Sequence, residues 1–167
     1  MDTEAEQKHE EILYKDSVWL NDAVQFTSTQ KEVLDKLGKP DSITTPMFEC
    51  GAYIQGEEPW GDKVNIWHYQ GTEIVTFKDR AEIMKIRLKG WECTLHDSQM
   101  IFSGETSIED LREVFPKSVK NSYEWKDVTK GIRYTLVKIA PNPNYDDSWI
   151  LKFYKNQLIE IEYYTPC

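Results

Sequence analysis

Histidine and cysteine are scarce in this chain, which contains three residues of each type among 167. No histidine belongs to an HExxH motif or stands at metal-ligand spacing from a cysteine or an aspartate, so we expect no metal site. The cysteines, Cys50, Cys93 and Cys167, form no CxxC pair, and their odd number favours a reducing compartment over a disulfide framework. A Cys50–Cys93 disulfide with Cys167 unpaired is the alternative if the protein is exported.

Residue groups typical of enzymes are also missing. The acidic pairs Glu57-Glu58 and Asp146-Asp147 are adjacent in sequence, which is typical of solvated loops and not of an acid–base pair. No glycine-rich phosphate loop precedes a helix. A nucleophilic pair of Cys50 or Cys93 with His68 stays open, because such residues meet only in space. We therefore expect a protein that is not an enzyme and needs no cofactor.

Basic residues are outnumbered, with 20 Lys and Arg against 29 Asp and Glu and a net charge of −9. An acidic protein repels phosphate backbones, so nucleic acid is a poor partner and a basic protein is a better one. Residues 1–16 hold six acidic and two basic residues, which predicts an acidic tail or a short helix. No apolar run reaches the length of a membrane span, and residues 1–16 are polar and acidic, so we expect neither a membrane span nor a signal peptide. We expect a cytoplasmic protein, or a periplasmic or lipid-anchored one if a leader has been removed.

The signature of a short amphipathic helix with marked ends occurs twice. Residues 29–40 begin with a capping box, Thr29 and Glu32, and end at Gly38 and Pro40. Residues 106–116 repeat the box and the apolar stripe. The matching positions, each pair 77 residues apart, are Thr29 and Thr106, Glu32 and Glu109, Leu34 and Leu111, and Leu37 and Val114. This spacing predicts a tandem duplication.

Strand-like segments surround both helices, and hairpins at 18–26 and 94–102 precede them. The expected strands after the helices are 64–69, 74–77, 82–88, 131–139, 149–154 and 158–164. The predicted fold class is α+β, with two tandem hairpin–helix–antiparallel-sheet repeats that form one sheet with short helices on one face. The predicted divisions are an acidic segment at 1–16, a first repeat at 17–90 and a second repeat at 91–167.

Alternation along the strands predicts which side chains face away from the core. Lys152 and Tyr154 should point outward, and aligning the turns after Tyr69 and Tyr154 places Trp67 and Tyr69 outward as well. Lys85 and Arg87 should also point outward. The expected inward residues are Ile66, His68, Met84, Ile86, Leu88, Leu151, Phe153, Ile159 and Ile161. Exposed aromatic and basic side chains together are typical of interfaces, although β-propensity alone also explains tyrosine in strands.

The helix ending Leu37-Gly38-Lys39-Pro40-Asp41, followed by an antiparallel hairpin, resembles a group that contains the β-lactamase inhibitor protein and small outer-membrane-assembly lipoproteins. That inhibitor is a tandem duplication of a helical segment with an antiparallel sheet. The segment from Gly104 to Leu111, with Phe115-Pro116 after it, is similar to uncharacterised bacterial proteins suspected to be immunity proteins for secreted toxins. The resemblance implies an acidic, non-enzymatic binder, with an envelope lipoprotein of scaffold or assembly role as the alternative.

We expect the partner to bind the exposed face of the sheet. Rigid aromatic side chains on strands bind at low entropic cost, and acidic loops at the rim would speed the encounter with a basic partner. The predicted function is an inhibitor or immunity protein that neutralises a basic protein such as a bacterial toxin. The predicted contact residues are Trp67, Tyr69, Lys152 and Tyr154 at the centre, with Glu57, Glu58, Trp60, Tyr145, Asp146 and Asp147 at the rim.

Overall fold

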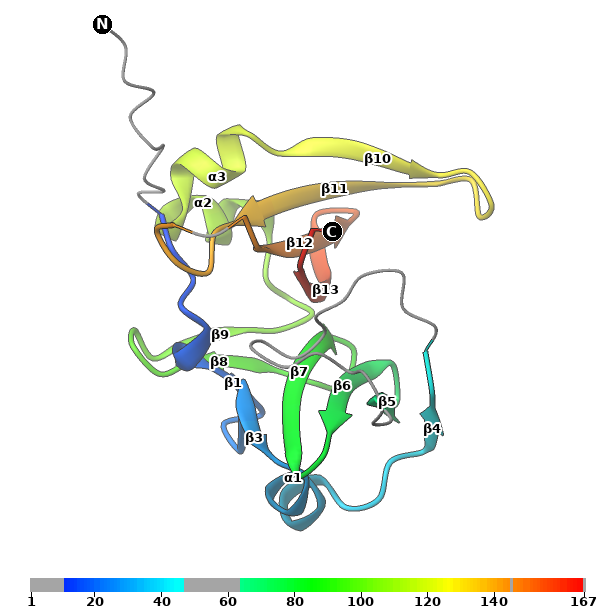
Figure 1. The fold of residues 1–167 in the computed structure, drawn as a ribbon. Coiled ribbons are helices and arrows are strands. Elements are labelled where there is room, and N and C mark those ends of the chain that lie inside the picture. The colour runs from blue at the N-terminus through cyan, green and yellow to red at the C-terminus, as the bar shows by residue number, and fades with distance from the viewer. Residues whose placement is uncertain (1–10, 47–63, 145, 167) are drawn as a thin grey trace, which may run out of the picture.

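The computed structural model describes residues 11–46, 64–144 and 146–166, which form two antiparallel sheets and three short α-helices (Figure 1). The smaller sheet has the order β2 (Val24–Gln25), β1 (Val18–Leu20), β8 (Cys93–Leu95) and β9 (Met100–Phe102). The larger sheet has the order β10 (Tyr123–Asp127), β11 (Ile132–Ile139), β12 (Ser148–Tyr154), β13 (Gln157–Tyr164), β7 (Arg80–Arg87), β6 (Thr72–Phe77), β5 (Val64–Tyr69) and β4 (Ser42–Thr44). A further short strand, β3 (Thr27–Thr29), pairs with the start of β7. The predicted antiparallel sheet with a few short helices is confirmed, which is consistent with the α+β class. The two predicted hairpins, however, form a separate small sheet and do not join the large one.

The helices form where local capping signals predict them. In α1 (Gln30–Leu37) the Thr29 hydroxyl accepts a 3.1 Å hydrogen bond from the Glu32 amide, and Gly38 adopts a φ of 77° after the last turn. In α2 (Ile108–Val114) the predicted cap is wrong by one residue, because Ser107 and Asp110 form the capping box. The hydroxyl of Thr106 is buried and accepts a hydrogen bond from the Ser103 amide instead.

A third helix, α3 (Pro116–Lys120), follows α2 directly. Its proline stands in the first turn, where no intrahelical amide hydrogen bond is lost. The carboxylate of Glu11 accepts hydrogen bonds from the Lys117 and Ser118 amides at 3.0 and 2.7 Å. The N-terminal segment is thus attached to the start of α3, which leads through Asn121 into β10.

One main apolar core joins the smaller sheet, the helices and one face of the larger sheet. The helices contribute Val33, Leu111 and Val119, which are all buried. Trp149, near the start of β12, is completely buried and donates its indole N–H to the Leu13 carbonyl at 2.9 Å. The core therefore covers only one side of the larger sheet.

In each strand of the larger sheet, the residues that alternate with the core residues lie on the opposite side of the sheet, which we call the open face. Trp67 is opposite Ile74 and both belong to the main core, whereas the neighbouring pair, His68 opposite Glu73, lies on the open face. A small buried apolar cluster on the open face consists of Val64, Val75 and Phe77.

The outward placement of Trp67 and Tyr69 is wrong, because these side chains are only 7% and 4% exposed and pack in the main core. The Tyr69 hydroxyl donates to the Gly38 carbonyl at 2.9 Å, and burial, with the nearby Asp41 carboxylate, raises the pKa of Tyr69 to about 12. The predicted inward position of His68 is wrong, since His68 lies on the open face, half-buried. Ile66 lies on the same face as His68 but is buried, as predicted, at 7% exposure.

Trp67 and Tyr69 were assigned to the wrong face because the turns after Tyr69 and Tyr154, which were aligned with each other, are not equivalent in the structure. The turn after Tyr69 joins the second and third strands from the β4 end of the sheet, whereas the turn after Tyr154 joins the third and fourth strands from the β10 end. A strand's position in the sheet decides which face is covered, so equal distance from a turn does not imply the same face.

The predicted inward positions of Ile159 and Met84 are also wrong, because β-bulges, each with one extra residue, reverse the alternation of side chains along the strand. A bulge in the β12–β13 pair places Leu158 opposite Phe153, so Leu158 is completely buried and Ile159 only half-buried. A bulge in the β6–β7 pair does the same near Met84, which is half-buried while Ile83 is in the core. Ile86, Leu88, Leu151, Phe153 and Ile161 are buried as predicted.

Candidate functional site

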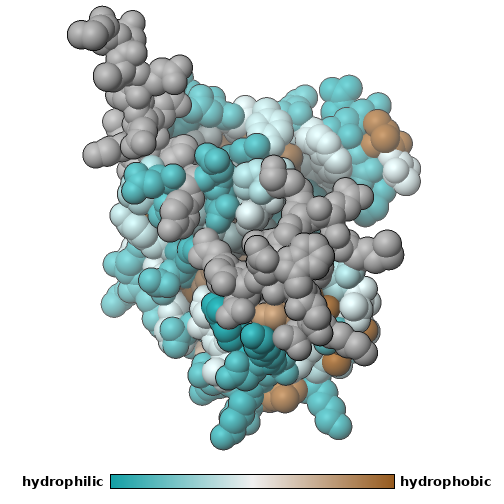
Figure 2. All heavy atoms as spheres, in the orientation of Figure 1, coloured by the Kyte–Doolittle hydropathy of each residue, from teal (hydrophilic) through white to brown (hydrophobic). Residues whose placement is uncertain are grey.

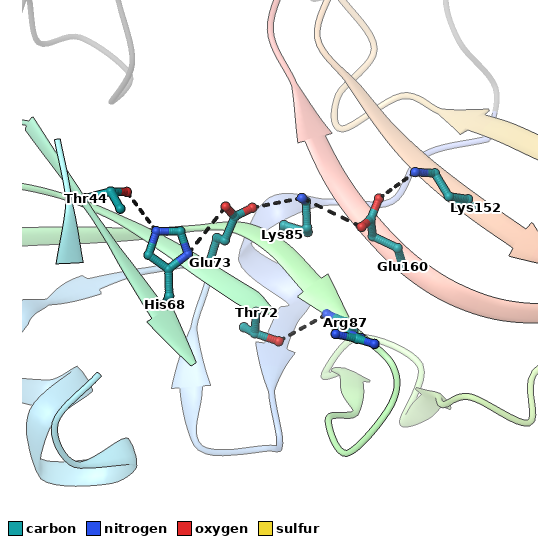
Figure 3. A network of polar contacts seen from close by, with 8 residues as sticks. All are labelled: Thr44, His68, Thr72, Glu73, Lys85, Arg87, Lys152 and Glu160. Carbon is teal, nitrogen blue, oxygen red and sulfur yellow. Dashed lines mark hydrogen bonds and ion pairs between the residues drawn. The ribbon is translucent and has the colours of Figure 1, made fainter. Parts of the chain in front are cut away.

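A row of polar contacts crosses the open face, with one side chain from each successive strand (Figure 3). On β4 and β5, Thr44 Oγ1 lies 2.8 Å from His68 Nε2. His68 Nδ1 lies 3.7 Å from Glu73 Oε1 on β6, a contact that is an ion pair only when the imidazole is protonated. Glu73 Oε2 lies 3.0 Å from Lys85 Nζ on β7. These four residues fix one another's side-chain positions from the edge of the sheet to its middle.

The row continues through the second half of the sheet to an aromatic group. Lys85 Nζ lies 3.7 Å from Glu160 Oε1 on β13, and Glu160 Oε2 lies 3.2 Å from Lys152 Nζ on β12. The Lys152 ammonium lies 5.0 Å from the ring centroid of Tyr134 on β11 and 5.5 Å from that of Trp125 on β10. Both distances are within the range of cation–π attraction. The row, from Thr44 to Trp125, therefore uses one residue from each of the eight consecutive strands.

The charged side chains of the row are only partly accessible, with exposed fractions of 17% for Glu73, 28% for Lys85, 19% for Glu160 and 23% for Lys152. Burial lowers the pKa of Lys85, but Glu160 and Glu73 raise it by more, so the ammonium is held in its charged form. Glu162, directly opposite Lys85, has a raised pKa because it is buried and because Glu160 repels its charge. Glu162 is thus a carboxylate on the open face whose negative charge is incompletely compensated.

The aromatic end of the row forms a platform at the β10 edge. The rings of Trp125 and Tyr134 are stacked with centroids 5.9 Å apart, and Tyr154 packs against Tyr134 at 5.9 Å. Tyr123 and Trp125 are 41% and 44% exposed. Hydrophilic residues make up most of the coloured surface of the molecule seen in Figure 2. Lys138 lies 5.8 Å from the Tyr123 ring centroid. Tyr123, Trp125, Tyr134 and Tyr154 are together called the aromatic platform below.

Two of the predicted contact residues lie where the sequence places them. Lys152 and Tyr154 are half-buried on the open face and belong to the row and to the aromatic platform. Trp67 and Tyr69 are not part of the site, because they are in the core. Asp146 is exposed, and Asp147 accepts a hydrogen bond from Tyr163, whose ring packs against the main core. The remaining predicted residues, Glu57, Glu58, Trp60 and Tyr145, lie outside the described residues.

Several residues that make the site continuous were not predicted from the sequence. His68 and Glu73 are on the open face because of the register of β5 and β6. Trp125 and Tyr134 are opposite each other in the β10–β11 hairpin, whose β10 segment has no buried residue to reveal its period. The available signal was the Tyr-Glu-Trp alternation at 123–125, followed by a turn that ends at Gly131.

The described part of the chain offers little for catalysis. Cys93 is a free thiol completely buried in the main core, and burial raises its pKa to about 12, so it is not available as a thiolate. His68 lies on the opposite side of the large sheet, so these two residues do not form a nucleophilic pair. Among residues 11–46, 64–144 and 146–166, no three His, Cys, Asp or Glu side chains are grouped to hold a metal ion. Nor does any helix in these ranges have the length and apolar character needed to cross a membrane.

No protein-family model, no curated protein and no solved structure matches this chain.

Proposed function

We propose that this protein is a non-enzymatic binding module whose protein partner covers the open face of the larger sheet. In this proposal it acts as an inhibitor or immunity protein for a basic protein such as a bacterial toxin. The observation that carries the proposal is the row from Thr44 to Trp125, which crosses eight strands and ends in the aromatic platform.

A preorganised row of this kind suits recognition. The side chains of Glu73, Lys85 and Glu160 are held by one another on a rigid sheet, so little conformational entropy is lost when a partner binds. Aromatic side chains such as Trp125 are the residues that most often dominate interface energetics. Its 44% exposure leaves ring area for a partner to bury.

The charges favour a basic partner. The net charge of −9 would steer a cationic protein toward this chain. Glu162 gives a local reason, because its raised pKa shows that its negative charge is unfavourable in the free protein. A lysine or arginine from a partner, placed near Glu162, would stabilise that charge and gain binding free energy that an uncharged side chain could not.

We also propose that the chain is built from two copies of one unit, at 17–90 and 91–167. The order of the larger sheet supports this, since β4 to β7 on one side of the central β7–β13 pair correspond to β10 to β13 on the other. The smaller sheet supports it too, because its central pair joins β1 from the first part to β8 from the second. Such a duplication explains how a broad, nearly symmetric sheet arises from short segments.

The test is co-expression of this protein with the basic proteins encoded beside its gene, scored by survival of the host and by direct binding. Trp125→Ala should weaken the complex by about tenfold or more if the platform anchors it. The matched control is Leu34→Ala, which removes a similarly exposed apolar side chain (41%) from α1, outside the larger sheet. Host protection that survives Leu34→Ala but fails with Trp125→Ala would support the proposal.

Two results would contradict it. If no neighbouring basic protein is bound or neutralised, the inhibitor role is wrong. If the protein instead co-purifies with an envelope assembly component, the scaffold alternative replaces it, and equal weakening by both variants would show that the open face is not the contact.

A further inference from the structure

β10 is an edge strand with an accessible backbone. Among the described residues it pairs with β11 alone, and Figure 1 shows the β10–β11 hairpin projecting beyond the rest of the sheet. The four residues from Tyr123 to Lys126 are all exposed. The outer row of N–H and C=O groups of such a strand can pair with another strand.

The side chains of β10 are complementary to themselves in the antiparallel direction. If a second β10 pairs with the first about Trp125, Glu124 lies opposite Lys126 of the partner subunit and Lys126 opposite Glu124 of the partner subunit. The two Trp125 residues then lie opposite each other. Opposite charges directly across a strand pair stabilise it, and so do paired aromatic rings. The register is fixed by this two-fold arrangement, since a shift by two residues opposes like charges or leaves them unpaired.

We propose that two copies of this chain associate through antiparallel pairing of β10, centred on Trp125, so that the two larger sheets become one continuous sheet. The interface is isologous, as in most homodimers. It joins the two open faces and brings the two aromatic platforms together at the centre. The exposed rings of Tyr123 and Trp125 stay on the open face, beside the strand of the partner copy. Because only five residues per strand take part, the dimer is weak and depends on protein concentration.

Because the surroundings of β10 are positively charged, the two cross-strand ion pairs decide whether the dimer forms. The β10–β11 hairpin, residues 123–139, contains four basic and two acidic residues, a local excess of +2 in a chain of net charge −9. Two such hairpins repel each other unless specific pairs offset the repulsion. Glu124 is available for this, because its contact with Arg133 in its own chain is long, at 3.8 Å, with both side chains at least 70% exposed.

The experiment is sedimentation equilibrium of the full chain over a wide concentration range. The wild type is expected to show a reversible monomer–dimer equilibrium. Glu124→Lys and Lys126→Glu each convert two attractive pairs into two repulsive ones, so each should raise the dissociation constant about tenfold. The double variant Glu124→Lys/Lys126→Glu restores both pairs with exchanged positions and should dimerise like the wild type.

Mixing the two single variants is the most discriminating test of the proposal. The Glu124→Lys variant and the Lys126→Glu variant should each be mainly monomeric alone but should form a heterodimer when mixed, because each lysine then faces a glutamate. Glu113→Lys, an exposed charge reversal on α2, is the control and should leave the equilibrium unchanged. A wild type that stays monomeric at all concentrations overturns the proposal, and so does a dimer that ignores the reversals or a mixture that does not associate. Circular dichroism of each variant shows that loss of association is not loss of folding.

Discussion

Replacing Lys85 with methionine would test whether the polar row stabilises the sheet. The Lys85 ammonium lies between the carboxylates of Glu73 and Glu160, at 3.0 and 3.7 Å, and Lys85 is directly opposite Glu162. A charged hydrogen bond as short as that to Glu73 contributes about 1.5–3 kcal/mol, and the longer contact to Glu160 adds about 1 kcal/mol or less. Methionine keeps most of the apolar contacts of the lysine stem. We therefore expect Lys85→Met to lower the free energy of unfolding by about 2–4 kcal/mol at pH 7.

The pH dependence of this loss identifies its electrostatic cause. Without Lys85, the pKa of Glu162, already raised by burial and by Glu160, should rise further. A carboxyl group whose folded pKa is above its unfolded pKa binds more protons when folded, so stability falls as pH rises through that window and returns as pH falls. Most of the deficit of Lys85→Met should therefore disappear on going from pH 7 toward pH 4.

The assay is urea denaturation followed by circular dichroism at both pH values. The matched control is Lys89→Met, which removes the same charge from an exposed residue just after β7 and should change stability by less than about 0.5 kcal/mol. In the wild type, the raised pKa of Lys85 means that its contribution persists through neutral pH and is lost only in the alkaline range above its unfolded pKa. A Lys85→Met deficit of equal size at pH 7 and pH 4 would refute the electrostatic explanation.

Two further predictions test the face assignment and the buried thiol. Trp67→Ala should lower the free energy of unfolding by about 3–5 kcal/mol because it empties part of the core, whereas Tyr154→Ala on the open face should cost about 1 kcal/mol. Similar losses in urea denaturation would mean that the faces are wrongly assigned. With Cys50 and Cys167 replaced by serine, the buried Cys93 should react with a thiol reagent only at the rate of unfolding, because burial raises its pKa to about 12. Fast labelling of the native protein would contradict this.

The sequence predicted features whose cause is local. Thr29 and Gly38 mark the ends of α1 because capping depends on residues within one helical turn. The cap of α2 was misplaced by one residue because Thr106 and Ser107 are each followed three residues later by a carboxylate. Only the bond from the Ser103 amide to the Thr106 hydroxyl, a feature of the loop conformation, decides between them.

The candidate site depends on contacts that no local pattern contains. Strand segments such as β5 could be predicted from alternation, but their faces could not, because the face that is covered depends on where the strand lies in the sheet. Trp67 and Tyr69 were therefore placed outward although they are in the core, and His68 was placed inward although it is in the row. Bulges near Met84 and Ile159 reversed the alternation again.

The sequence alone thus determined the short capped helices, the antiparallel α+β class, the net acidity and the scarcity of catalytic residue types, because each follows from composition or from neighbours along the chain. Only the tertiary structure decided that Glu73 of the first half meets Lys85 and then Glu160 of the second half, and that Lys152 reaches Trp125. These residues are separated by long stretches of sequence, and the pairing of β7 with β13 brings them together. A side-chain row across a sheet is set by strand order and register, which are long-range properties of the fold.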